Sequence, residues 1–297
     1  MNRRPSDQTA HKMRRALLGT LLLVAAATAS RRHESLTQPM VSCPPRDFTN
    51  ALRRLATHLR PGTMARAGGV ATLVTHYRTH YGGVCLPYNV PGGPHHNHSW
   101  PRSALKTGKK KLILDLSEGT TGTRFLHCVA STGLGLDARH GVGKARKFTT
   151  RDFDSWAMVM DSPVPYLVRQ LVEAHSSTQL GTFLTVRDPW DWHVKRFKHR
   201  GAHGKANWTA AGACSGRPTP LGAPDASAMV PRDLLVFFAW TLCLTRARGF
   251  PCPVINLFDD HSPGQLTTKK RFLDVLTDAG HAFDMADLDR AWAACRT

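Results

Sequence analysis

The sequence predicts an α/β protein with a largely parallel sheet flanked by helices, preceded by an irregular, basic N-terminal region. Apolar runs of strand length alternate with amphipathic stretches of helix length over residues 111–297, as is typical of such sheets. The chain has 297 residues and 41% apolar side chains, enough for one substantial core, which excludes a collagen-like or wholly disordered chain. The net charge of +19 is concentrated at the start, because residues 1–111 hold 18 of the 40 basic but 3 of the 21 acidic residues.

The leading segment has the order of a secretory signal. Basic residues up to Arg15 precede an apolar run from Ala16 to Ala27, and small residues follow it. The run is shorter than the about 20 apolar residues that a membrane-crossing helix needs. We therefore expect a cleaved signal peptide over residues 1–30 and a Golgi-lumenal or secreted protein. An uncleaved signal anchor, which alone would attach the chain to a membrane, and an organelle transit peptide are the alternatives.

Seven cysteines suit an oxidising compartment. They lie at positions 43, 85, 128, 214, 243, 252 and 295, without a CxxC motif or a spacing typical of zinc sites. We expect disulfides, whose pairing the sequence leaves open, and at least one thiol unpaired within a monomer. Cys128, in an apolar helix-like stretch, is interpreted as a core thiol rather than a nucleophile. Sequons at Asn97 and Asn207 are compatible with a glycoprotein.

Residues 31–110 are predicted to form a basic stem and surface region. Proline and glycine clusters interrupt this stretch, and its one weak helical pattern covers residues 47–59. Histidines at positions 95, 96 and 98 follow one such cluster, and we interpret them as a solvated turn rather than a metal site. The α/β domain is expected over residues 111–297.

Strand and helix patterns alternate through that domain. Short apolar runs predict strands at residues 112–116, 182–186 and 254–258. Amphipathic or long apolar stretches predict helices at residues 124–134, 163–174, 231–248 and 267–278, with another after Pro189. Ligands of such sheets bind beyond the carboxyl ends of the strands, so the residues after each strand are the candidates for a functional site.

A turn rich in glycine and threonine follows the first strand. Its residues are Gly119, Thr120, Thr121, Gly122 and Thr123, and a helix is predicted directly after it. Glycine lets the backbone come close to an anion, threonine hydroxyls donate hydrogen bonds, and a helix start carries a positive dipole end. The turn is therefore predicted to bind phosphate. It is not a Walker A loop, because no GK[ST] follows at the required spacing.

A second candidate for phosphate binding follows the strand at residues 182–186. Arg187 stands at its end, where a guanidinium can hold a phosphate through two hydrogen bonds. Asp188 and Pro189 are interpreted as the start of the next helix, which carries Lys195. Two phosphate-binding groups at two strand ends predict a ligand with phosphates at both ends.

These segments resemble sulfotransferases that use 3′-phosphoadenosine 5′-phosphosulfate, in particular a branch of short sulfotransferase-like proteins of algae, fungi and invertebrates. The matching segments, in the expected order, are residues 112–126, 161–163, 183–192 and 254–259. The resemblance implies a P-loop-like sheet and transfer of a sulfuryl group from this nucleotide to a hydroxyl or amine of a carbohydrate or small acceptor, without a metal. It assigns the phosphosulfate to the Gly/Thr turn and the ribose 3′-phosphate to Arg187, with Lys195 as a further phosphate contact.

The resemblance also implies a base that takes a proton from the acceptor. His140 falls where this branch often has a histidine, and its ordinary pKa suits the role; a surface loop histidine is the alternative. Asp161 is a second candidate, either as a base or as a helix cap. Glu118 is interpreted as a solvated turn residue rather than an acid or base.

The chain departs from the family at Thr120, where members usually carry a lysine or arginine that neutralises charge on the bridging oxygen. Arg124, at the start of the following helix, is the candidate substitute. A non-catalytic basic protein that binds sulfated glycans through residues 1–111 is therefore one alternative. A lumenal glycosyltransferase is another, because the Asp-Phe-Asp motif at residues 152–154 has a form that holds manganese and a nucleotide sugar. Nucleic acid is not an expected partner, since the basic stretches lack interleaved aromatic residues.

Overall fold

The computed structural model describes residues 43–81, 110–141, 156–161, 164–201, 226–258 and 262–296, all within one compact unit, Ser42–Thr297. Several predictions concern residues outside these ranges. They are the signal segment, both sequons, the three-histidine turn, Cys85, Cys214 and the Asp-Phe-Asp motif. These stay predictions.

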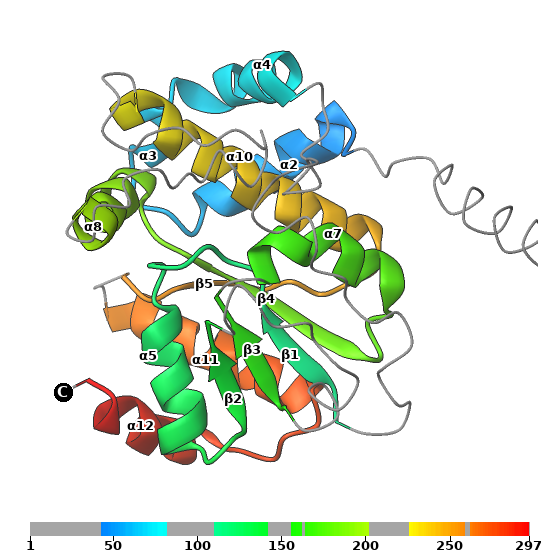
Figure 1. Ribbon diagram of the computed structural model, residues 1–297, viewed down its shortest axis with the longest axis vertical. Coiled ribbons are helices and arrows are strands. Elements are labelled where there is room, and N and C mark those ends of the chain that lie inside the picture. Colours follow the sequence, from blue (N-terminus) through cyan, green and yellow to red (C-terminus); the bar gives the residue numbers. More distant parts are fainter. Residues whose placement is uncertain are drawn as a thin grey trace, which may run out of the picture. The chain divides into compact units, whose positions relative to one another are not determined.

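The centre of the unit is a five-stranded parallel sheet (Figure 1). Its strands are β1 Leu112–Asp115, β2 Ala138–His140, β3 Met158–Met160, β4 Leu180–Val186 and β5 Val254–Asn256, in the order β2-β3-β1-β4-β5. In the central strand β1, Ile113 pairs with Met158 on one side and Gly181 on the other. The predicted parallel α/β architecture is confirmed. The sequence pattern did not predict β2 and β3, because three residues are too few to show a strand period.

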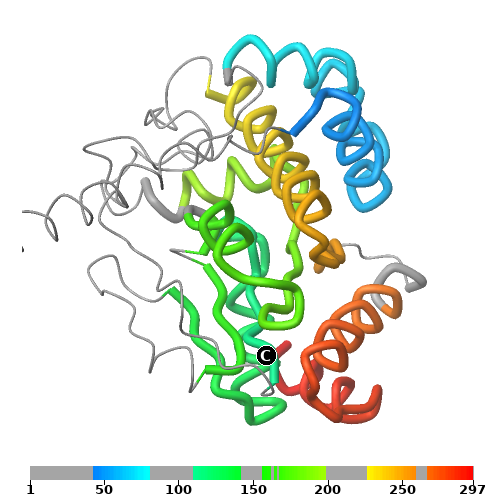
Figure 2. The backbone as a smooth tube through the Cα atoms, turned by 90° about the vertical axis from the view of Figure 1, so that its right-hand side faces the viewer, coloured from blue at the N-terminus to red at the C-terminus, as the bar shows by residue number. Residues whose placement is uncertain are grey.

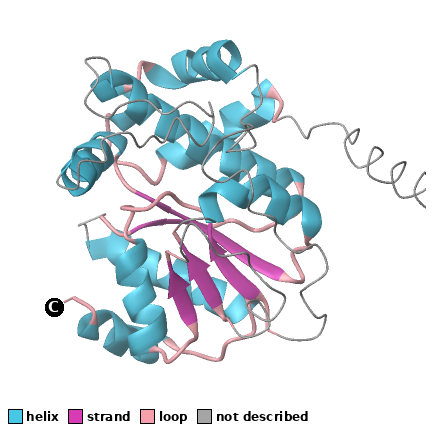
Figure 3. Cartoon of the chain, viewed as in Figure 1, coloured by secondary structure: helices cyan, strands magenta, loops and turns pink. Residues whose placement is uncertain are grey.

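Helices cover both faces of the sheet. They are α2 Pro45–Ala56, α3 Thr63–Arg66, α4 Gly69–Tyr81, α5 Thr123–Cys128 with a π-helical turn Val129–Gly133, α7 Val164–Ala174, α8 Pro189–Gly201, α10 Ala226–Ala247, α11 Ser262–Asp278 and α12 Met285–Ala294. α7 and α10 cover one face, and α2 and α4 lie outside α10 (Figure 2). α5, α11 and α12 cover the other face (Figure 3), where Phe183 of β4 packs with Phe272 of α11.

Helix α10 is apolar all round, and its side chains from Val230 to Thr245 are almost all buried. Because every side of such a helix must be covered, α2, α7 and α8 pack around it. Among the described helices α10 alone has the length and apolarity of a membrane span, yet 83% of its apolar window is buried inside the unit. This burial is typical of the core helix of a globular unit.

Part of the expected stem is a helical layer of this same unit. Phe48, Leu52 and Leu55 of α2 are fully buried, and α2 packs against α10. Phe48 also stacks on Tyr77 of α4, with ring centroids 4.0 Å apart. Apolar residues three and four positions apart give α2 one apolar face, and α10 offers the surface that buries it. Among the described residues, the predicted boundary between 110 and 111 therefore does not separate two compact units.

Two disulfides join distant parts of the chain. Cys43 pairs with Cys243 of α10, and Cys128 of α5 pairs with Cys295 after α12. Both pairs agree with the expected disulfides. The interpretation of Cys128 as a core thiol is wrong, because Cys128 forms a disulfide. Its partner lies 167 residues away, beyond the reach of any local sequence pattern. Cys252 is the free thiol of the described residues, and burial raises its pKa to about 12.

The turn after α2 is joined to the sheet and to α11 through His58. Its carbonyl accepts a hydrogen bond from Asn256 Nδ2 at 2.7 Å, and its Nδ1 lies 2.8 Å from Arg271 Nη1. Since an arginine can only donate, Nδ1 carries no proton. Burial, followed by the charges of Arg271 and Arg54, lowers the pKa of His58 to about 4.

This low pKa predicts that the fold is sensitive to acid. Below the unfolded pKa of about 6.5 the unfolded chain binds more protons at His58, so the contribution of His58 to stability is present above that pH and is lost as the pH falls toward 4. We expect His58→Asn, which keeps a hydrogen-bond acceptor, to reduce the loss in free energy of unfolding between pH 7 and 4.5 by about 1–2 kcal/mol, after allowing for partial exposure. Urea denaturation at both pH values measures the difference. Equal losses in the two proteins would contradict it.

Candidate functional site

The candidate site lies at the edge where the parallel strands end. After β1 the chain turns toward β2, whereas after β4 it turns toward β5, so the two connections diverge between adjacent strands. In open α/β sheets, ligands bind at such a switch point, outside the carboxyl ends of the strands. The loop after β1, His140 of β2, Asp161 after β3 and Arg187 after β4 all reach this edge. The sequence placed only the loop and Arg187 at the end of a strand. The strands β2 and β3, which it did not predict, bring His140 and Asp161 to the same edge.

The loop between β1 and α5 has a backbone suited to an anion. Thr120 (φ 78°) and Gly122 (φ 106°) are both left-handed, a feature of the backbone nests that bind anions. Within the described residues, the backbone N–H groups of Gly119 to Gly122 donate no hydrogen bond, so they are available to an anion. Thr121 Oγ1 donates to the carbonyl of Glu118 at 2.8 Å and closes the turn. The predicted strand, turn and helix are confirmed.

A buried carboxyl group holds this loop to the neighbouring strand. Asp115, at the end of β1, accepts hydrogen bonds from Ser117 and from the N–H and hydroxyl of Thr185. Thr185 Oγ1 also lies 2.7 Å from Thr121 Oγ1. Burial raises the pKa of Asp115 to about 6, and the hydrogen bonds from Ser117 and Thr185 oppose that rise. The network joins β1, its loop and β4, so the loop has a fixed support.

Helix α8 brings two further side chains to the loop, which the sequence analysis did not identify. Trp192 is fully buried, and its Nε1 donates to the carbonyl of Gly119 at 2.8 Å. Arg196 is 4% exposed, and its Nη1 donates to Thr120 Oγ1 at 3.0 Å. The signal that could have identified them is their spacing of four residues, which places both on one face of a helix that begins at the site edge.

Gly119 lies between Arg196 and Asp161. A Cβ atom added to Gly119 would stand 2.6 Å from Asp161 Oδ1 and 3.0 Å from Arg196 Nη1, so glycine is what lets both groups approach the loop. Asp161 itself has φ 65°, a left-handed conformation that aspartate tolerates better than most residues. The guanidinium of Arg196 therefore stands beside Thr120, where the loop itself lacks a cation.

His140 and Asp161 form a pair at the ends of β2 and β3. His140 Nε2 lies 2.9 Å from Thr123 Oγ1 and 3.5 Å from Asp161 Oδ2. Because a carboxylate can only accept, we assign the proton to Nε2, which leaves Nδ1 as the basic nitrogen. Burial lowers the pKa of His140, Asp161 opposes this, and His127 and Arg124 lower it further. The pKa is lowered overall, so the imidazole is neutral at pH 7 and able to take a proton.

Arg187 stands at the end of β4, as predicted. Its guanidinium lies over the ring of Phe258, 4.1 Å from the centroid, and its buried Nε has no hydrogen-bond partner among the described residues. Burial lowers the pKa of Arg187, and the charge of Asp191 opposes this most strongly. A stacked guanidinium with an unused donor is suited to hold an anion through two hydrogen bonds.

Asp188 and Pro189 begin α8, as predicted. Asp188 Oδ1 accepts hydrogen bonds from the N–H groups of Trp190 and Asp191, each at 3.1 Å. Asp188 is therefore the N-cap of α8. Lys195 of α8 and Arg124 of α5 are exposed. The charge of Arg124 contributes to the lowered pKa of His140. Their phosphate-binding roles stay predictions.

Glu118 is not the solvated turn residue that we expected. Its side chain is fully buried, because the chain from Leu116 to Gly119 stays inside the unit before it emerges at Thr120. The local pattern, a polar residue before a Gly/Thr turn, could not indicate this burial, since it depends on the elements packed over the loop.

Gly122 is predicted to be required for the loop to fold. A Cβ atom there would stand 2.3 Å from Leu257 Cδ1, and the left-handed backbone disfavours any side chain. We expect Gly122→Val to lower the free energy of unfolding by about 2–4 kcal/mol. Thermal and urea unfolding measure it. Adding Leu257→Ala removes the clash but not the backbone strain, so a double variant that recovers none of the loss would contradict this explanation.

Within the described residues, no group of three or more His, Cys, Asp or Glu side chains is placed to hold a metal ion. Comparisons of the chain with protein-family models, with curated proteins and with solved structures found no significant match.

Proposed function

We propose that the protein is a sulfotransferase that moves a sulfuryl group from 3′-phosphoadenosine 5′-phosphosulfate to a hydroxyl or amine of a carbohydrate or small acceptor. The observation that carries the proposal is the convergence at one switch point of a Gly/Thr loop, two arginines and a histidine–carboxylate pair. The resemblance over residues 110–280 supports a P-loop-like fold and a metal-free reaction. The N-terminal pattern and the disulfides support a secretory-pathway protein, in the Golgi lumen or secreted.

In this proposal the nucleotide lies across the carboxyl ends of β1 and β4. The loop N–H groups and Arg196 hold the phosphosulfate, and Arg187 holds the ribose 3′-phosphate. Arg196 then takes the place of the cation that the family usually carries on the loop. It suits this role better than Arg124, because its Nη1 already contacts the hydroxyl of Thr120 at 3.0 Å.

His140 supplies the base. The acceptor oxygen or nitrogen attacks sulfur and its proton passes to His140 Nδ1, while the bond from sulfur to the bridging oxygen breaks and leaves its electron pair on that oxygen. Arg196 stabilises the negative charge that develops there. Asp161 stabilises the imidazolium that forms, as the carboxylate beside a catalytic histidine does in other transferases and hydrolases.

Calorimetry with adenosine 3′,5′-bisphosphate, the desulfated donor, tests the nucleotide site directly. We expect micromolar binding to the purified chain that lacks the signal segment, and none of a UDP-sugar with manganese. Binding of the UDP-sugar instead would favour a glycosyltransferase. Binding of neither would favour a non-catalytic protein that recognises glycans through its basic N-terminal region.

The lowered pKa of His140 predicts the pH dependence of transfer. The base must be neutral, so kcat/KM should fall only below the ordinary histidine range, with an acidic limb under pH about 6.5. Asp161 raises the pKa of His140, so Asp161→Asn should shift that limb to lower pH. His140→Gln should remove it. An acidic limb that persists unchanged in His140→Gln would exclude His140 as the base.

A further inference from the structure

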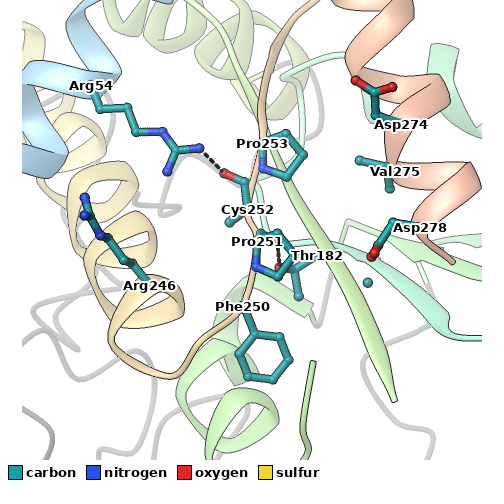
Figure 4. A pocket seen from close by; sticks show the side chains of 11 residues that line it. Arg54, Thr182, Arg246, Phe250, Pro251, Cys252, Pro253, Asp274, Val275 and Asp278 are labelled. Carbon is teal, nitrogen blue, oxygen red and sulfur yellow. Dashed lines mark hydrogen bonds between the residues drawn. The ribbon is translucent and has the colours of Figure 1, made fainter. Parts of the chain in front are cut away.

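A cavity lies at the opposite edge of the sheet from the candidate site, where the strands begin. It encloses about 430 Å³ and is formed by the start of β4, the segment Phe250–Pro253 before β5, and helices α2, α10 and α11 (Figure 4). Because β4 and β5 are parallel, residues at their beginnings lie at the amino ends of the strands, away from the switch point. The volume is in the range of small-molecule sites, which is roughly 300–1,000 Å³.

The floor of this cavity is apolar and well supported. Phe250, Pro251 and Pro253 line it, and the prolines restrict its backbone. The carbonyl of Pro251 accepts a hydrogen bond from Thr182 Oγ1 at 2.8 Å, and the carbonyl of Cys252 accepts one from Arg54 Nη2 at 3.0 Å. These hydrogen bonds from β4 and α2 hold the floor in place, so a ligand bound there would order little of the chain, which lowers the entropic cost of binding.

Opposite charges stand on the two walls. Figure 4 shows Arg54 and Arg246 on one side of the Phe250–Pro253 segment and Asp274 and Asp278 on the other. Asp278 forms an ion pair with Lys111 at 2.8 Å. In the described part of the chain, neither Arg246 nor Asp274 has an ion-pair partner. Arg54 also has no ion-pair partner among the described residues, but it donates to the carbonyl of Cys252. Arg246 and Asp274 are therefore the cation and the anion that the cavity presents to a ligand across an apolar floor.

We propose that this cavity binds a short zwitterionic peptide with apolar side chains. Its carboxylate would pair with Arg246 and its ammonium group with Asp274, while its side chains cover the floor. An anion alone would face the carboxylates of one wall, and a cation alone would face the arginines of the other. A peptide, unlike a free amino acid, carries its two charges at separate ends, and so complements both walls.

Calorimetry with the dipeptide phenylalanyl-leucine tests the proposal. We expect saturable binding to the disulfide-intact protein, weakened at least about tenfold when the dipeptide is N-acetylated or C-amidated, because each block removes one charge-assisted hydrogen bond. Arg246→Ala and Asp274→Asn should each weaken it similarly. Both residues are exposed, so the variants are expected to fold, and their thermal unfolding checks this. Arg53→Ala, on α2 but outside the cavity lining, is the matched control and should bind as the parent protein does.

Three results would overturn the proposal: no saturable binding to the folded protein, equal affinity for the N-acetylated dipeptide, or unchanged affinity in both cavity variants. Arg54 is left intact because it holds the carbonyl of Cys252. The proposal does not depend on sulfuryl transfer. Arg246→Ala should bind adenosine 3′,5′-bisphosphate at the other edge of the sheet as the parent protein does. The proposal for the cavity and the proposal for the nucleotide site can therefore be tested independently.

Discussion

Replacing Arg187 by alanine is expected to weaken the binding of adenosine 3′,5′-bisphosphate by about 10- to 100-fold, the usual effect of losing charge-assisted hydrogen bonds to a phosphate. The side chain lies flat on Phe258 and keeps its buried Nε without a partner among the described residues. Its donors are thus positioned before the nucleotide binds, and little ordering entropy is lost. Calorimetry of the variant against the parent protein measures the change.

Three further variants make this test specific. Arg187→Lys keeps the charge but not the planar fork, so its affinity should lie between those of the parent and Arg187→Ala. Arg290→Ala removes an exposed cation of α12 and should leave the affinity unchanged. Adenosine 5′-phosphate, which lacks the 3′-phosphate, should bind the parent and Arg187→Ala equally. Equal affinity of both proteins for the bisphosphate would exclude Arg187 from the site.

Arg196→Gln is expected to lower kcat of sulfuryl transfer by about 10²- to 10³-fold, as loss of a group that stabilises transition-state charge does. The affinity for the bisphosphate should fall much less, because the charge on the bridging oxygen develops only during transfer. Arg196 is 4% exposed, so its loss also affects packing, and the free energy of unfolding must be measured alongside. A variant that loses affinity and kcat to the same extent would assign Arg196 to binding alone.

A second-site substitution separates the catalytic role of Arg196 from a structural one. Thr120→Lys puts a cation on the loop, at the position where the resembling family usually carries one. In the Arg196→Gln background, Thr120→Lys should raise kcat at least about tenfold over that of Arg196→Gln alone. It should not restore stability, since a lysine at a left-handed position (φ 78°) adds no packing. Restored stability without restored kcat would indicate that Arg196 only supports the loop.

Local patterns predicted the elements that carry the longest signals. The apolar runs that became β1, β4 and β5 and the helices α7, α8, α10 and α11 were all expected. The strands β2 and β3, of three residues each, have no such signal. Because these two strands place His140 beside Asp161, that pair could not be predicted either. The sequence showed the weak helical pattern at residues 47–59, but it did not show that α2 packs against α10 within the unit.

The candidate site shows the same division. The Gly/Thr loop and Arg187 were predicted because each follows a readable strand, and parallel strands bring their ends to one edge. Arg196 was missed because one cation among several on a helix is distinguished only by what it contacts. Glu118 was misread for the related reason that exposure is decided by covering elements rather than by the residue's own turn.

The α/β class, the Gly/Thr turn and the strand end at Arg187 could be predicted from the sequence, since each depends on residues adjacent in the chain. Three other features required the packed structure: the contact of Arg196 with Thr120 across 76 residues, the pairing of Cys43 with Cys243 across 200, and the opposite charges on the two walls of the cavity before β5. The difference lies in the range of the interactions. Strand period, turn geometry and helix capping act over a few residues, whereas ion pairs, disulfides and burial depend on which distant surfaces pack together.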